Sequence, residues 1–195
     1  MEVYKQFRNP STGEILSIVY DVCPESPRTW GGNVGRFLVR DNCKYIDNES
    51  DVSLNFSDRN GDAAALDKNP DVIAYLPVYV YDHSGACMNT TGFSCPWDSG
   101  QIGWIVCTRE SLRGAWISWA RITEERRKVI MDMLRGEVEV YNSFMSGEVY
   151  GYELYAANPE GDRDDDMIDE GYGYYGDAGI KDILKEYPEF TEEIA

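Results

Sequence analysis

The sequence has little of what catalytic and metal sites are usually made of. Its 195 residues include one histidine and five cysteines, an odd number without paired spacing, which indicates reduced thiols rather than a disulfide framework. No apolar run approaches the roughly 20 residues of a membrane-spanning helix. The opening residues, MEVYKQFR, lack the apolar core of a signal peptide. These absences predict a cytosolic protein that does not contact membranes.

Basic residues are also scarce, with 18 Lys and Arg against 35 Asp and Glu, a formal net charge of −17. Such a protein repels nucleic acid and anionic membranes and is attracted to basic surfaces. A solvated acidic surface that only keeps the chain in solution is the alternative explanation. Hydrophobic residues make up 43% of the chain and aromatic residues 13%, which is enough to bury a core.

Hydrophobic periodicity predicts an α+β fold, with a mostly antiparallel mixed sheet packed against one long helix. The helix is expected over 123–145, with Thr123 as N-cap and a glycine, Gly147, after its end. Its buried face is predicted from spacings of three and four residues, at Ile130, Leu134, Val138, Tyr141 and Met145. Strands are expected near residues 3–8, 14–22, 34–40, 72–81, 102–107 and 148–156.

The composition predicts one α+β domain over residues 1–157, with an acidic segment over 158–195 docked on it. That segment has 13 acidic and three basic residues, and tyrosines and glycines interrupt it. A short terminal helix with Ile180, Ile183, Leu184 and Tyr187 is expected to do the docking. The polar stretch 41–70 is predicted to be a mobile insertion with one short helix near 62–67.

The run from residue 109 to residue 135 is opposite in sign to the acidic segment. Its basic side chains are expected to pair with that segment or to lie solvated on a helix face. A nucleic-acid contact is the competing interpretation, which the strongly negative whole chain disfavours. The seven basic residues are Arg109, Arg113, Arg121, Arg126, Arg127, Lys128 and Arg135.

The segment between the two central strands, 83–101, is longer than a hairpin connection needs, and long connections are often functional. It contains Cys95 and His83, and Asp82 directly precedes it. A cysteine nucleophile needs a base that takes its proton, and His83 is the one histidine available. The alternative is a structural cysteine and a hydrogen-bonded histidine that fixes the loop. No family spacing supports the catalytic interpretation.

Two metal sites can be considered, and neither has the required spacing. His83, Cys87, Cys95 and Cys107 lack the short paired knuckle of structural zinc. Asp162, Asp164 and Asp166 resemble the start of an EF-hand loop, but Met167 stands where the loop needs glycine and Gly173 where it needs glutamate. The sequence therefore predicts no metal site and no cofactor.

Two motifs, LPVYVYDHSG at residues 76–85 and FSCPWDSGQIG at 93–103, resemble a family of small proteins encoded by bacteriophages and other mobile elements. RGEVEVY at 135–141, SGEVYG at 146–151 and GYGYYG at 171–176 resemble the same family, so the resemblance covers roughly residues 70–176. The family is uncharacterised and supplies no catalytic residues. Cys87 stands where a threonine or small apolar residue is expected, which argues against a metal ligand there. The resemblance implies a phage or prophage protein in the bacterial host cytoplasm.

Charge and context together predict an inhibitor of a host defence nuclease, of the anti-CRISPR or anti-restriction type. Nucleases hold DNA in basic grooves, and an acidic surface that mimics DNA would block such a groove. The expected partner is a basic, nucleic-acid-handling host protein, such as a Cas or restriction nuclease, without direct contact to nucleic acid. Partner contacts are predicted at Glu137, Glu139, Asp162, Asp164, Asp165, Asp166, Asp169, Glu170, Tyr172, Tyr174 and Tyr175.

Two other functions are open. One is a small hydrolase or transferase that uses the His83–Cys95 loop. The other is a purely structural or regulatory phage protein, which no feature of the sequence excludes.

Overall fold

The computed structural model describes residues 1–54, 56, 59–157 and 163–194, with the backbone alone at 163–166. The chain divides into two compact units. Unit 1 comprises Met1–Ser26 and Ser143–Ala195, and unit 2 comprises Pro27–Asn142. Unit 2 is thus inserted into the sequence of unit 1. This division differs from the boundary expected at residue 157, because strands on both sides of that residue pair with each other.

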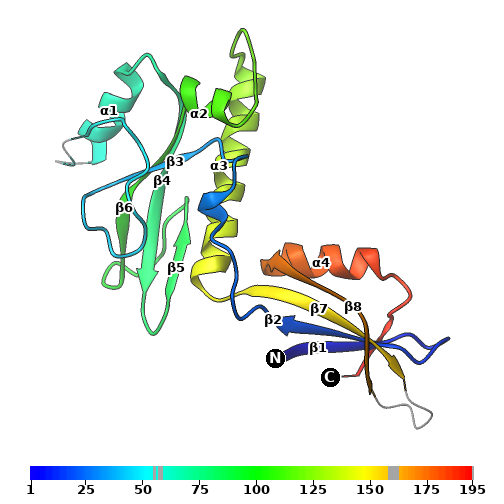
Figure 1. Ribbon diagram of the computed structural model, residues 1–195. Helices are drawn as coiled ribbons and strands as arrows, with labels where there is room; N and C mark the ends of the chain where they lie inside the picture. Colours follow the sequence, from blue (N-terminus) through cyan, green and yellow to red (C-terminus); the bar gives the residue numbers. More distant parts are fainter. Residues whose placement is uncertain (55, 57–58, 158–162, 195) are drawn as a thin grey trace. The chain divides into compact units, whose positions relative to one another are not determined.

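Unit 1 is built on an antiparallel sheet in the order β8-β7-β2-β1-β9 (Figure 1). The first two strands form a hairpin whose turn is closed by a hydrogen bond from the Gly13 amide to the Asn9 carbonyl, 2.8 Å, with Gly13 at φ +78°. This confirms the turn signal of the NPSTG stretch. The strands are β1 (Val3–Arg8), β2 (Ile15–Tyr20), β7 (Val149–Ala157), β8 (Arg163–Tyr175) and β9 (Glu192–Glu193).

Helix α4 (Gly176–Glu186) covers one face of this sheet (Figure 1). Ile180 and Ile183 of the helix are buried against strand residues from three different parts of the sequence. The predicted docking helix is therefore confirmed. The strand side of this core consists of Phe7, Leu16, Ile18, Tyr150, Tyr152 and Leu154, and Phe190 completes it.

Unit 2 has its own antiparallel sheet in the order β3-β6-β4-β5 (Figure 1). The predicted strands thus form two sheets, and the α+β class with antiparallel strands and one long helix is confirmed. The elements of this unit are η1 (Pro27–Thr29), β3 (Arg36–Val39), α1 (Arg59–Lys68), β4 (Val72–Asp82), β5 (Ala86–Asn89), β6 (Ser99–Thr108), α2 (Arg109–Gly114) and α3 (Glu124–Met145), whose last residues belong to unit 1.

The long helix α3 packs on this sheet through the apolar stripe that was predicted from the sequence. The Thr123 hydroxyl accepts a hydrogen bond from the Arg126 amide, 3.3 Å, as expected of an N-cap. The rings of Tyr141 and Phe37 lie 5.6 Å apart, and a side chain at Gly35 would collide with Leu134. Ile130, Leu134, Val138 and Tyr141 are buried, which confirms the stripe except for the half-buried Met145.

A second core cluster contains Leu66 of α1 and Trp104 of β6. The short helix predicted within 41–70 is confirmed as α1, and it contacts the sheet. Leu66 is fully buried, and the Tyr75 hydroxyl donates to the Asp67 carboxylate at 2.8 Å. The helix is held because its apolar side chains reach the sheet.

Strand β8 departs most from the sequence-based expectation. Its acidic residues predict an appended segment, yet 163–175 form a strand paired with β7 along most of its length. Backbone hydrogen bonding does not depend on side-chain charge, and β8 lies at the edge of the sheet, where Asp169 and Glu170 are exposed. Among the helices that the structure describes, none is long and apolar enough to cross a membrane.

Candidate functional site

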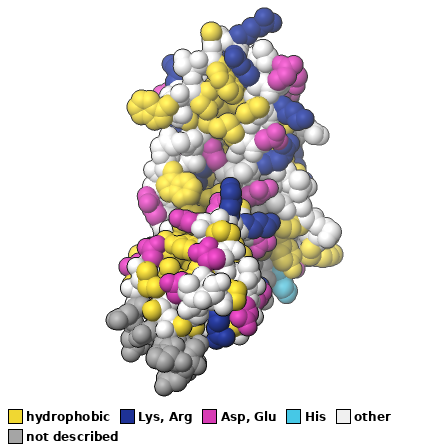
Figure 2. All heavy atoms as spheres, turned by 90° about the vertical axis from the view of Figure 1, so that its right-hand side faces the viewer, with side chains coloured by type: hydrophobic (Ala, Val, Ile, Leu, Met, Phe, Trp, Pro, Cys, Tyr) yellow, Lys and Arg dark blue, Asp and Glu magenta, His cyan; other side chains and the backbone are white. Residues whose placement is uncertain are grey.

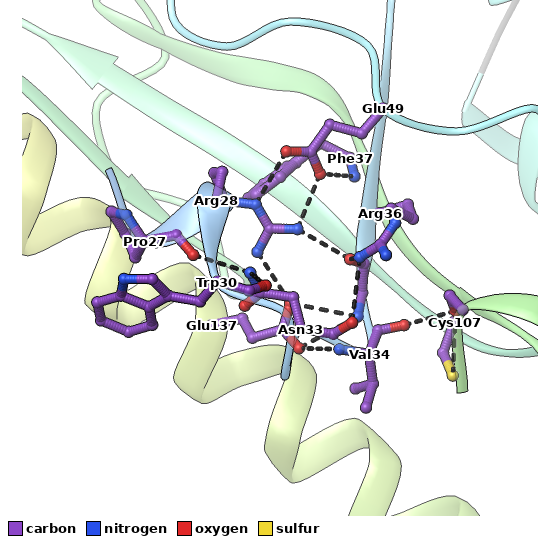
Figure 3. Close-up of polar contacts among 12 residues, drawn as sticks. Pro27, Arg28, Trp30, Asn33, Val34, Arg36, Phe37, Glu49, Cys107 and Glu137 are labelled. Atoms are coloured by element: carbon purple, nitrogen blue, oxygen red, sulfur yellow. Dashed lines mark hydrogen bonds and ion pairs between the residues drawn. The ribbon is translucent and has the colours of Figure 1, made fainter. Parts of the chain in front are cut away.

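A largely buried charge of unit 2 is the guanidinium of Arg28, in η1 (Figure 3). Its Nε and Nη2 atoms donate to the two carboxylate oxygens of Glu49, at 3.0 and 2.8 Å. Its Nη1 donates to Glu137 of α3 at 2.9 Å, and Nη2 also donates to the Gly35 carbonyl at 2.8 Å. The guanidinium lies over the Phe37 ring, 4.9 Å from its centroid. We call this group the Arg28 network.

The two carboxylates of the Arg28 network also accept backbone hydrogen bonds. Glu137 accepts from the amides of Val34 at 2.6 Å and Gly35 at 3.1 Å, and Glu49 accepts from the Phe37 amide at 3.0 Å. Burial lowers the pKa of Arg28, but the hydrogen bonds and charges of the two glutamates outweigh it and raise that pKa above its ordinary value. The network therefore joins a loop, a strand and a helix through one charged guanidinium.

Glu137 is one of the predicted partner contacts, and in the structure its carboxylate is engaged within unit 2. Its side chain is 13% exposed and both oxygens are used within unit 2. A carboxylate engaged in this way is not available to a second protein without breaking the network. Glu139, on the other hand, is exposed on the same helix.

Two of the three residues considered for catalysis, His83 and Cys95, contact the same carboxylate, which is that of Asp98. The His83 Nδ1 atom lies 3.4 Å from Asp98 Oδ2, and the Cys95 thiol donates to the same oxygen at 3.5 Å. Asp82 instead pairs with Lys44 and accepts from the Tyr45 hydroxyl at 2.9 Å. The carboxylate that contacts both the thiol and the imidazole is therefore that of Asp98, and Asp82, the third residue considered for an enzyme, is engaged elsewhere.

The connection that carries these residues is not a single long loop. Its first part turns through Ser84 and Gly85 into β5, which forms a hairpin with β4. Its second part ends in a short turn before β6, where the Trp97 side chain is 91% exposed. Four residues of the segment, Ala86–Asn89, thus form an added strand, and its last residues belong to β6, so part of its length is structural.

The zinc ligand set considered for the sequence is not assembled. Cys107 is buried in β6, where burial raises the pKa of its thiol to about 11. Cys87 is exposed. Within the described part of the chain, no three His, Cys, Asp or Glu side chains lie close enough together to hold a metal ion. Asp164 and Asp166 belong to β8, an extended strand rather than the loop of an EF-hand, and Asp162 lies outside the described residues.

The acidic residues predicted for partner binding lie mostly in unit 1. Asp169 and Glu170 are exposed on β8, while the side chains of Asp164, Asp165 and Asp166 lie outside the described part. The hydroxyls of Tyr187 and Tyr152 donate to Asp169 at 2.7 and 3.1 Å, and these hydrogen bonds lower the pKa of that carboxylate. A further set of exposed carboxylates follows along α4 and the last strand, at Asp177, Asp182, Glu186, Glu189, Glu192 and Glu193.

The three tyrosines predicted as anchors differ in availability. Tyr172 is 39% exposed and donates to Glu170 at 3.0 Å and to the buried Glu153 at 3.4 Å. Tyr174 packs edge-on against Tyr152, and the Tyr175 hydroxyl donates to the Glu25 carbonyl. Tyr172 is the one whose ring is most open to a partner, while the other two are half-buried.

The charge of the chain is distributed unequally between the units. Unit 1 has 19 acidic and five basic residues, a formal charge of −14, whereas unit 2 has 16 and 13, a formal charge of −3. Figure 2 shows Asp and Glu predominating over Lys and Arg on the visible face of unit 1. Nearly all of the net charge therefore belongs to one compact unit.

Comparison with protein-family models, with curated proteins and with solved structures found no match for this chain. Its function must therefore be argued from the geometry and charge described above.

Proposed function

We propose that unit 1 is a protein-binding module whose acidic face occupies the basic nucleic-acid groove of a partner protein. The observation that carries the proposal is the concentration of charge, −14 of the total −17, in one compact unit. A surface that served only to keep the chain in solution would not need this segregation. The neighbouring unit is almost neutral and is built from the same chain.

The secondary structure of unit 1 supports mimicry of a nucleic-acid backbone. Side chains on the same face of a β-strand recur every second residue, at about 6.6 Å, close to the roughly 6.8 Å axial rise of two phosphate steps along one DNA strand. Carboxylates on a strand edge and on the adjoining helix α4 can thus lie at spacings that a phosphate-binding groove accepts. Asp169 is held by two tyrosine hydroxyls, which lowers the entropy lost when a partner binds it.

The biological setting follows from the resemblance to phage-encoded proteins. On that basis the partner is a host defence nuclease, of the restriction or CRISPR type, and the protein acts as its inhibitor in the bacterial cytoplasm. Binding blocks the groove by competing with the nucleic acid. The affinity of such a complex falls steeply with salt, because it depends on charge pairing across the interface.

The test begins with a low-salt pull-down of the tagged protein from bacterial lysate, read by mass spectrometry. A nuclease recovered in this way is then purified and loaded with labelled DNA, and added protein should release the DNA. A variant with Glu170→Gln, Asp177→Asn and Asp182→Asn should release it poorly. The matched control removes three exposed acids of unit 2, with Asp41→Asn, Asp47→Asn and Asp51→Asn.

The control variant loses the same formal charge but leaves the acidic face of unit 1 intact. Equal loss of DNA release in both variants would show that only total charge matters, and the proposal would fail. Recovery of no nucleic-acid-handling protein at low salt would also contradict it.

The alternative function, an enzyme centred on the His83–Cys95 loop, has one geometric observation in its favour. The thiol and the imidazole both lie within 3.5 Å of Asp98 Oδ2. A thiol reactivity measurement separates this alternative from the inhibitor, because a catalytic Cys95 should be alkylated faster than the other four thiols.

A further inference from the structure

The connection between α2 and α3 in unit 2 exposes a tryptophan among arginines. The Trp116 side chain is 90% exposed, and its backbone has φ +62°, a left-handed conformation that bulky residues rarely adopt. Burying such a ring against apolar surface stabilises a fold by about 1.5–3 kcal/mol, so a ring left in water points to a role outside the fold. We call this surface the basic aromatic surface; its members are Arg109, Arg113, Trp116, Trp119, Arg121, Arg126 and Lys128.

The basic side chains of this surface are exposed and mostly unpaired. Among the described residues, the side chains of Arg109, Arg113, Arg121 and Lys128 make no hydrogen bond or ion pair. The exception is Arg126, whose guanidinium lies over the Trp119 ring at 5.1 Å and donates to the Arg121 carbonyl at 2.7 Å. Four cationic groups are therefore available to an anionic ligand, and a fifth already stacks on an aromatic ring.

Local charge favours an anion here although the whole chain is acidic. Residues 109–135 contain seven basic and four acidic residues, and unit 2 as a whole carries only −3. Figure 2 shows Lys and Arg interspersed with hydrophobic side chains at the top of the visible face, where α2 and α3 are joined in Figure 1. The argument from total charge against nucleic acid thus applies to unit 1 rather than to this surface.

Two concave regions meet at Arg109 and Arg113. A pocket of about 280 Å³ is lined by both arginines and by the apolar side chains of Ile73, Leu112, Ile117, Trp119 and Ile122. A polar cleft of about 550 Å³ shares both arginines and is lined by Arg36, Ser50 and Ser53, and also by Glu49, Asp51, Asp71 and Glu110. The two arginines therefore line both a partly apolar depression and a polar one, a combination that suits a ligand with flat apolar parts and charged groups.

We propose that the basic aromatic surface binds single-stranded nucleic acid, a function beyond the one proposed for unit 1. The exposed Trp116 ring stacks on an unpaired base, and the arginines contact the phosphates on either side. Arginine suits this role because its planar guanidinium pairs with phosphate and stacks on bases. Duplex DNA is a poorer ligand, because its bases are stacked on each other and are not free to stack on tryptophan.

An acidic protein segment is the other ligand that this charge would accept. It offers carboxylates to the arginines but no set of flat rings for an isolated, fully exposed indole. The stacking of Arg126 on Trp119 shows that this surface already favours contacts between planar groups. We therefore assign the single strand and make the acidic peptide an outcome of the test.

The test measures anisotropy of a fluorescein-labelled oligothymidylate of about 15 nucleotides with the full-length chain at low salt. Trp116→Gly is the central variant, since glycine accepts the left-handed backbone and the loop keeps its conformation. Loss of one stacked base should raise the Kd about tenfold or more. Replacing Arg113 and Arg121 by Ala should reduce the slope of log K against log salt by about 0.7 per phosphate contact.

Trp97→Ala is the matched control, because the Trp97 ring is 91% exposed but adjoins Asp98 rather than arginines. It should leave the Kd unchanged, and circular dichroism should show that both variants are folded. The proposal is overturned if the wild-type chain does not bind at low salt, or if the two tryptophan variants behave alike. Displacement of the oligonucleotide by polyglutamate, with no effect of Trp116→Gly, would overturn it in favour of an acidic protein ligand.

Discussion

Arg28 is the residue whose surroundings place the strictest demands on the fold of unit 2. Three chain segments contribute acceptors to one guanidinium. The loss of either glutamate therefore leaves the largely buried Arg28 side chain with only one carboxylate partner. We expect Glu137→Ala to lower the free energy of unfolding by about 3–5 kcal/mol. Urea denaturation followed by circular dichroism measures this change.

The matched control is Glu139→Ala, an exposed position on the same helix, for which a change below about 1 kcal/mol is expected. A similar loss at both positions would mean that the helix, and not the Arg28 network, is what Glu137→Ala disturbs.

The five cysteines should differ in their reactivity toward iodoacetamide at pH 8. Burial raises the pKa of Cys107 to about 11, so only about one thiol in a thousand is ionised there, and it should remain unlabelled in the folded protein. The exposed Cys23 and Cys87 should react first. Cys95 donates to Asp98 rather than to His83, and we expect it to react no faster than Cys23.

Peptide mass spectrometry at successive times gives the five rates, and denatured protein, in which all five react, is the reference. Labelling of Cys95 ahead of every other thiol would favour the enzyme over the inhibitor.

At the scale of single elements, the helix α3 contains a glycine whose replacement by alanine should stabilise the protein. Gly136 lies in the middle of the helix, and a Cβ added there would meet no atom within 4 Å. Gly136→Ala should therefore raise the free energy of unfolding by about 0.5–1 kcal/mol, through helix propensity alone.

Gly147→Ala provides the opposite control, because Gly147 ends the helix at φ +73°, where alanine is strained. It should lower stability by about 1 kcal/mol. Chemical denaturation compares both with the wild type, and a stabilising Gly147→Ala would show that the helix end is not held in this conformation.

Elements with strong apolar periodicity were predictable from the sequence. The segments near 3–8, 14–22, 34–40, 72–81, 102–107 and 148–156 correspond to β1, β2, β3, β4, β6 and β7, and the long helix was predicted within one residue at its start. β8 was not predictable in this way. Its pairing with β7 supplies backbone hydrogen bonds that no side-chain pattern reveals, and its Asp residues are typical of a solvated segment.

The candidate site was predictable only where it depends on composition. The excess of acidic residues is visible in the sequence, but its confinement to unit 1 depends on how residues 1–26 fold back onto 143–195. The Arg28 network could not be found at all, because Arg28 and Glu137 are 109 residues apart and neither belongs to a local motif.

At the scale of the whole molecule, unit 1 should be destabilised by its own charge. Nineteen acidic residues against five basic ones repel one another, and salt relieves this as the Debye length falls from about 30 Å at 0.01 M to about 3 Å at 1 M. We expect salt to slow amide hydrogen exchange in β7 of unit 1 more than in β6 of unit 2. Exchange mass spectrometry at several salt concentrations measures both strands in one sample.

Equal slowing of β6 and β7 would show that repulsion is spread over the chain. A larger effect in β7 would locate the charge repulsion in unit 1, where the proposed partner binds. Such a partner would then stabilise unit 1 in the same way as salt does.

The insertion of unit 2 into unit 1 also determines when the acidic unit can exist during translation. Tyr20 of β2 pairs with Tyr150 of β7, so β2 leaves the ribosome long before its partner strand is made. At about 5–20 residues per second, the delay is on the order of 10 s. Unit 2 is continuous in sequence and can fold within that interval, while unit 1 must wait for β7, β8 and α4. A newly made chain thus acquires its acidic binding face only after β7, β8 and α4 have been made.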